Sequence, residues 1–183
     1  MCCLHPLALR RALRAIALAS LAATTIGCSR LPVLHRGGQG HPAVATVARV
    51  VDGDTVDLHF SSGTERVRLL GIDTPETVKP NTPVQCFGPE ASARTKALLP
   101  HGITVRVERD GEARDRYGRL LLYVYRSRDG MFINLALVAE GYARILSIAP
   151  NTAHAADLSA AAAAASRAGR GLWSRCPPPP PPP

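Results

Sequence analysis

The stretch "VVDGDTVDLHF", residues 50–60, combines a chain reversal with the start of a strand. Asp52 and Asp54 flank Gly53, and Asp-Gly pairs are common in hairpin turns because glycine tolerates positive φ and aspartate hydrogen-bonds its own backbone. Beyond the turn, apolar and polar residues alternate over 56–60, which is typical of a half-buried strand. The stretch therefore predicts a hairpin. Its two carboxylates leave two interpretations open, a plain turn and a cation site.

The same alternation recurs on both sides of this hairpin. Further strands are expected over 46–51, 65–72, 103–107 and 119–127, and helices over 88–100 and 154–171. Residues 131–146 are expected to be a strand end that leads into a short helix, broken near Gly141. Pro89 suits the first turn of the first helix and Pro100 ends it. Five short strands with few residues between them predict a small closed barrel that is covered by helices. The predicted fold class is α+β, mainly β, with a five-stranded OB-type barrel and three helices.

The chain begins with a segment typical of an export signal. Arg10, Arg11 and Arg14 precede an uncharged run over 15–27, which is shorter than the roughly 20 residues that a membrane-spanning helix needs. Gly27-Cys28 resembles the end of a bacterial lipobox, which predicts lipidation of Cys28 and anchoring to the cell membrane. Free secretion after cleavage nearby is the alternative. In both cases the protein is expected to be exported.

The folded domain is expected over residues 44–176, between two segments of different composition. Residues 1–28 form the signal and residues 29–43 a linker containing glycine and proline, while 177–183 are seven prolines that favour polyproline II and cannot build a core. Loss of the signal would lower the formal charge from +8 to +5. A moderate positive charge suits a polyanionic partner and equally suits solubility.

Two cysteines remain in the domain once the signal is removed, Cys86 and Cys176. An even cysteine count in an exported protein predicts a disulfide, because the compartments outside the cytoplasm are oxidising. Two free thiols are the alternative.

Two further polar clusters follow the hairpin. One is "VRLLGIDTPE", residues 67–76, and the other is "DRYGR", residues 115–119. Each alone could be a turn with solvated charges. Together with the hairpin they supply carboxylates that suit a hard divalent cation such as Ca²⁺, arginines that bind two phosphate oxygens at once, and a glutamate able to take a proton from water. This set of groups predicts hydrolysis of a phosphodiester.

In this order and spacing, the motifs resemble the thermonucleases, the micrococcal-nuclease-like family. The similarity runs from about residue 44 to residue 173 and includes "VVDGDTV", "VRLLGIDTPET", "FGPEASARTK", "DRYGRLLLYVY", "NLALVAEGYA" and "GLWS". The resemblance implies an OB barrel with three helices and Ca²⁺-dependent cleavage of DNA and RNA that leaves 5′-hydroxyl and 3′-phosphate ends. A monomer is expected.

The resemblance also implies a metal site. Asp54 and Asp73 correspond to the carboxylates that hold the metal, and Thr74 to a residue that offers its backbone carbonyl. Asp52 corresponds to a carboxylate that lies behind these ligands.

The catalytic and substrate-binding residues follow from the same correspondence. Glu76 aligns with the general base that activates the attacking water. Arg68 and Arg119 align with the pair that binds the phosphate and stabilises the transition state. Arg116 and Tyr117 are expected at the substrate, with Tyr117 lining the nucleotide site.

The chain departs from the family pattern in two places. A stacking pair of tyrosines is expected within "ARILSIAPNT", residues 143–152, but Ser147 and Ala149 stand near those positions. Because base stacking is worth about 1–3 kcal/mol per base, affinity or base preference is expected to differ. The loop over 78–86 is also reshaped. The rival interpretations are an inactive OB module that binds nucleic acid or a protein partner, and a surface-anchored protein whose ligand is recognised by the proline tail.

Overall fold

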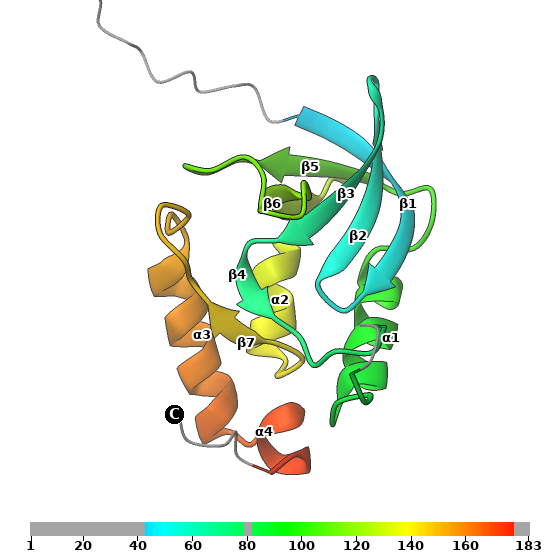
Figure 1. Ribbon diagram of the computed structural model, residues 1–183. Helices are drawn as coiled ribbons and strands as arrows, with labels where there is room; N and C mark the ends of the chain where they lie inside the picture. Colours follow the sequence, from blue (N-terminus) through cyan, green and yellow to red (C-terminus); the bar gives the residue numbers. More distant parts are fainter. Residues whose placement is uncertain (1–42, 79–81, 178–183) are drawn as a thin grey trace, which may run out of the picture. The chain divides into compact units, whose positions relative to one another are not determined.

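The computed structural model describes residues 43–78 and 82–177, and their centre is a closed barrel of five strands in the order β1-β2-β3-β6-β5 (Figure 1). The strands are β1 (Ala43–Asp52), β2 (Thr55–Phe60), β3 (Gly63–Leu69), β5 (Thr104–Glu108) and β6 (Leu120–Arg126). Four of the pairings are antiparallel, and the parallel pair β3–β6 closes the barrel. The predicted OB-type α+β fold is confirmed.

The barrel interior follows from the alternation in the sequence. Inward-facing residues such as Val47, Val56, Leu58 and Val67 have no measurable exposure. Burial of each such side chain contributes about 1.5–3 kcal/mol relative to its exposed state. The expected signal at 1–28, the linker except Ala43, and the proline tail except Pro177 lie outside the described residues.

Helices cover one end of the barrel (Figure 1). They are α1 (Gly88–Leu98), α2 (Ile133–Ala139), α3 (Ala155–Arg167) and α4 (Leu172–Arg175). Ile133 and Leu137 on α2 are fully buried in the barrel core, and α2 also packs against α3. The sequence predicted three helices; the four-residue α4 is an addition that follows the expected end of α3 near Gly169.

The strand expected over 65–72 is divided in two at Leu70. Gly71 has φ of +76°, and β4 (Gly71–Asp73) leaves the barrel to pair with β7 (Arg144–Leu146) in a separate two-stranded sheet. The Asn134 side-chain amide donates to the carbonyl of Leu70 at 2.8 Å, which satisfies the backbone at the break. The sequence did not predict β7. The break places Asp73 beyond the end of the barrel strand.

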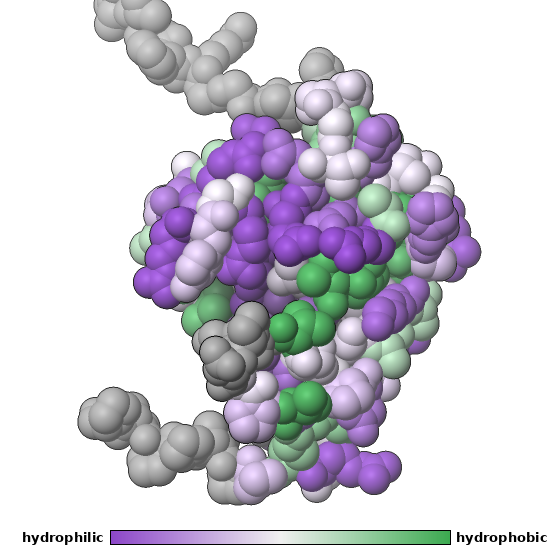
Figure 2. Space-filling model, turned by 45° about the vertical axis from the view of Figure 1, so that its right-hand side comes forward, coloured by the Kyte–Doolittle hydropathy of each residue, from purple (hydrophilic) through white to green (hydrophobic). Residues whose placement is uncertain are grey.

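The surface is uneven in polarity. Figure 2 shows one face, on which hydrophilic residues gather at the level of the barrel and a smaller hydrophobic patch lies below them. The exposed large hydrophobic residues of the described chain are Val44, Val78, Val84, Tyr117, Ile145, Leu146 and Ile148. Within the described ranges, no helix combines the length and apolar content needed to cross a bilayer.

Candidate active site

The turn between β1 and β2 is held from several sides. The buried Asp54 accepts the Thr55 hydroxyl at 2.9 Å on Oδ1 and the backbone N–H of Thr74 at 3.0 Å on Oδ2. The Thr95 hydroxyl of α1 donates to the Gly53 carbonyl at 2.6 Å. The hairpin is therefore a turn, as the Asp-Gly pair predicts, and it also fixes a carboxylate against the residue that follows β4.

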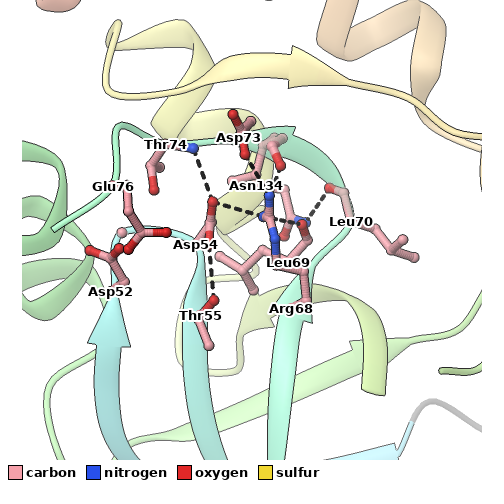
Figure 3. A network of polar contacts seen from close by, with 12 residues as sticks. Asp52, Asp54, Thr55, Arg68, Leu69, Leu70, Asp73, Thr74, Glu76 and Asn134 are labelled. Atoms are coloured by element: carbon pink, nitrogen blue, oxygen red, sulfur yellow. Dashed lines mark hydrogen bonds and ion pairs between the residues drawn. The ribbon is translucent and has the colours of Figure 1, made fainter. Parts of the chain in front are cut away.

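Arg68, near the end of β3, lies between two carboxylates (Figure 3). Its Nη1 is 2.9 Å from Asp54 Oδ2, and its Nη2 is 2.8 Å from Asp73 Oδ1. Nη1 also donates to the carbonyl of Ile72 at 2.9 Å. The Arg68 side chain is only 12% exposed. One guanidinium thus serves two carboxylates and leaves an excess of negative charge.

This excess suits a cation. Burial raises the pKa of Asp73 and the charge of Asp54 adds to that effect, while Arg68 and Arg144 oppose it. The Thr74 hydroxyl is buried and has no hydrogen-bond partner among the described residues. Carboxylate, hydroxyl and carbonyl oxygens are the ligands that Ca²⁺ prefers. No group of three or more Asp, Glu, His or Cys residues in the described chain is arranged around one metal position, so two carboxylates would need other oxygens to complete a shell. The residues present fit a hard divalent cation whose coordination shell is completed by such further oxygens.

Glu76 and Asp52 lie against each other on the opposite side of Asp54 (Figure 3). Asp52 accepts hydrogen bonds from the backbone N–H and the hydroxyl of Thr77. Burial raises the pKa of Asp52, but its hydrogen bonds, above all the one from the Thr77 hydroxyl, outweigh burial and hold this pKa below its usual value. Glu76 Oε1 in turn accepts the backbone N–H of Val78 at 3.0 Å. The Glu76 carboxyl is therefore held at a defined place.

Arg119 is oriented by a short loop before β6. Asp115 Oδ2 accepts Arg119 Nε at 2.7 Å, and Oδ1 accepts the backbone N–H groups of Tyr117 and Arg119. Burial raises the pKa of Asp115, but the hydrogen bonds from Arg119 outweigh burial and hold this pKa below its usual value. No described residue accepts a hydrogen bond from the two terminal nitrogens of Arg119. The sequence analysis included Asp115 in the motif over 115–119 but gave it no role. Its position in one short loop with Arg119 is the feature that could have indicated this role.

One cleft of about 600 Å³ gathers most of the expected site. Its lining includes Asp52, Asp54, Arg68, Asp73, Thr74, Glu76, Tyr117 and Arg119. Arg116 instead lines a neighbouring groove of about 580 Å³, with its guanidinium 4.9 Å from the ring centre of the exposed Tyr117. The sequence gave no role to Thr77, whose hydroxyl donates to Asp52, or to Gln85, whose side-chain oxygen accepts the backbone N–H of Glu76.

A disulfide joins Cys86 and Cys176, the pair expected from the sequence. Their Cα atoms are 5.8 Å apart although the residues are separated by 90 positions. Cys86 directly follows Gln85 and lies just before α1, while Cys176 ends α4. The bond ties the chain end to the loop that borders the cleft.

Sequence similarity relates the chain to known nucleases. Residues 66–175 match the family model described as staphylococcal nuclease homologue. The chain is 46% identical over 129 residues to a thermonuclease of Staphylococcus intermedius, which covers 70% of this chain and 75% of that protein. It is 43% identical over 128 residues to a thermonuclease of Staphylococcus hyicus, covering 70% and 74%. Endonuclease YncB of Bacillus subtilis (strain 168) is 42% identical over 120 residues, covering 64% and 56%.

Proposed function

The chain belongs to the family of staphylococcal nuclease homologues, and we propose that it is an endonuclease that cleaves DNA and RNA in a Ca²⁺-dependent reaction. The observation that carries this proposal is one cleft whose lining includes Arg68 and Arg119, the carboxylates of Asp54 and Asp73 that suit a cation, and Glu76. These groups match the needs of phosphodiester hydrolysis, in which negative charge develops on the phosphate oxygens.

The two arginines bind the scissile phosphate. Arg68 is partly buried and fixed by Asp54 and Asp73, and Arg119 is fixed by Asp115, so neither has to be ordered when the substrate arrives. A planar guanidinium matches two phosphate oxygens and stays charged at any working pH. Both therefore stabilise the extra charge of the pentacovalent transition state.

Glu76 takes the proton of the attacking water. The water oxygen forms a bond to phosphorus as the bond from phosphorus to the 5′ oxygen breaks. The 5′ oxygen takes up a proton from solvent, which leaves a 3′-phosphate and a 5′-hydroxyl. The backbone N–H groups of Thr77 and Val78 orient the Glu76 carboxylate for this transfer. Ca²⁺, held by Asp54, Asp73 and Thr74, would neutralise charge on the phosphate and position it. Tyr117 and Arg116 contact the nucleotides next to the cleft.

The test uses the full chain with DNA and with RNA, in Ca²⁺ and in excess Ca²⁺ chelator. We expect both substrates to be degraded in Ca²⁺ and neither in chelator, with end-group analysis giving 5′-hydroxyl and 3′-phosphate termini. Full activity in chelator would overturn the metal assignment. Binding of nucleic acid without cleavage in any divalent cation would favour an inactive OB module.

We also propose that the protein is exported and is anchored to the membrane through Cys28. The support is in the sequence, namely Arg10, Arg11 and Arg14 before the uncharged run and Gly27-Cys28 at its end. Cys28→Ser should release the protein from membranes or block its processing. An unmodified mature N-terminus at another position, found by mass spectrometry, would instead indicate free secretion.

A further inference from the structure

The backbone of Glu76 is held on both sides by one residue. The N–H of Glu76 donates to the side-chain oxygen of Gln85 at 3.0 Å, and the N–H of Gln85 donates to the carbonyl of Glu76 at 2.9 Å. The carbonyl of Gln85 also accepts the N–H of Gly88 at 3.0 Å, which closes a turn over residues 85–88. We call this segment the 85–88 turn.

The segment around Glu76 rests directly on the 85–88 turn. A Cβ atom at Gly88 would lie 2.8 Å from Thr77 Cγ2 and 3.1 Å from the carbonyl oxygens of Pro75 and Glu76. A side chain at Gly88 would therefore force Thr77 and the backbone of residues 75–76 to shift, because real Cβ atoms are almost never found closer than 3.0 Å to another heavy atom. The position of the turn therefore sets the position of the Glu76 backbone.

The 85–88 turn is anchored to the residue that ends α4 and to a neighbouring aromatic ring. Cys86 is bonded to Cys176, and the Phe87 ring stacks on Tyr142 with centroids 5.4 Å apart. Phe87 has φ of +67°, a left-handed conformation that costs free energy for a residue with a Cβ and persists only when its surroundings hold it. The disulfide and the stacked ring supply that support.

We propose that Gln85, fixed by the Cys86–Cys176 disulfide, is a positioning residue for Glu76. The inference rests on the proposed function, in which Glu76 takes the proton of water. Gln85 acts through the Glu76 backbone, whereas Arg68 and Arg119 are held by their own carboxylates. Loosening the turn should therefore slow the chemical step and leave phosphate binding intact. A displacement of about 1 Å at a reacting group can cost up to about 10²-fold in rate.

The first experiment reduces the disulfide of the folded chain with a dithiol. The dithiol gives two electrons and two protons to the Cys86–Cys176 bond, which becomes two thiols, and is itself oxidised to a disulfide. We expect kcat to fall about tenfold, with KM unchanged within about twofold and with recovery on reoxidation. The Cys86→Ser/Cys176→Ser variant should have the low kcat from the start and no response to the dithiol.

The second experiment keeps the disulfide and removes the acceptor. Gln85→Met has a similar length but no side-chain oxygen, and should also lower kcat at unchanged KM. Asp129→Asn is the matched control, because Asp129 is an exposed partner of Arg126 at the opposite end of β6 from Arg119. Circular dichroism at the assay temperature separates lost positioning from lost folding.

Each outcome decides the inference. A kcat that stays at the wild-type value in both the folded, reduced protein and Gln85→Met would overturn it, as would a loss of activity that only parallels unfolding. If the oxidised wild type is active and neither reduction of the disulfide nor Gln85→Met alters kcat, the positioning role is refuted and the proposed function is not. An oxidised wild type without nuclease activity refutes the proposed function and the inference with it.

Discussion

Two arginine–carboxylate groups, each with an arginine on β3, have opposite stoichiometry. In the middle of β2, Asp57 accepts Arg49 Nε at 2.7 Å and Arg66 Nε at 2.9 Å, so two arginines serve one carboxylate. In the cleft, one arginine, Arg68, serves two carboxylates. The strand register pairs Asp57 with Arg66, and Arg68 lies two residues further along β3.

The difference shows in which group the arginines balance the carboxylate charge and in which they do not. Hydrogen bonds from Arg66 hold the pKa of Asp57 below its usual value and outweigh burial, with a further contribution from Arg49. Burial instead raises the pKa of Asp73 in the cleft, where Arg68 is shared. The Asp57 group has enough positive charge for its carboxylate and stabilises the fold. The Arg68 group lacks positive charge and is suited to bind a cation.

The largest difference between the groups should be in activity. Arg68→Ala and Arg119→Ala should each lower kcat by about 10²–10³, because each removes a charged donor to the transition state. Arg49→Ala, an exposed arginine of the Asp57 group, should stay within about twofold of wild type. Steady-state kinetics on a short oligonucleotide measures this. Equal losses in all three variants would break the distinction.

The second difference should be in stability. Asp57→Asn leaves Arg49 and Arg66 without a charged acceptor and should lower the free energy of unfolding by about 1–3 kcal/mol. Asp73→Asn, measured in Ca²⁺-free buffer, should cost less than Asp57→Asn, because the Asp73 carboxylate is already disfavoured by burial and by Asp54. Urea unfolding of both variants gives the comparison. The reverse order would show that the cleft group is the structural one.

The smallest effect is the pH dependence of the Asp57 contribution. The folded-state pKa of Asp57 lies below its ordinary value of 3.8, so its stabilisation is complete above that value and is lost as the pH falls through the lower folded-state pKa. The gap in unfolding free energy between wild type and Asp57→Asn should therefore be constant from pH 7 to pH 5 and should shrink below about pH 4. Urea unfolding at pH 7, 5 and 3 measures the gap. A gap that widens in acid would contradict the assignment.

The sequence predicted the features that have a period or a motif. Alternation identified the five barrel strands, and the ordered motifs brought Asp54, Arg68 and Arg119 into one candidate site. The break at Leu70 was missed because a single glycine inside an apolar run does not distinguish one strand from two. α4 was missed because four residues carry no period.

The contacts of Gln85 were beyond the sequence for a different reason. Hydrogen bonds between a side chain and a distant backbone leave no spacing to recognise. Counting cysteines predicted the Cys86–Cys176 pair, but only the folded chain reveals that the bond lies next to the support of Glu76. The same holds for Asp57: the alternation of apolar and polar residues predicted its strand but not its contacts with Arg49 and Arg66.

The central claim is that the shortage of positive charge around Asp54 and Asp73 makes the cation site. Calorimetric titration of the full chain with Ca²⁺ tests it directly, with Asp54→Asn/Asp73→Asn and Asp57→Asn beside the wild type. We predict that wild type and Asp57→Asn bind Ca²⁺ alike and that the double variant, shown to be folded, binds none. Undiminished Ca²⁺ binding by the folded double variant would contradict the account.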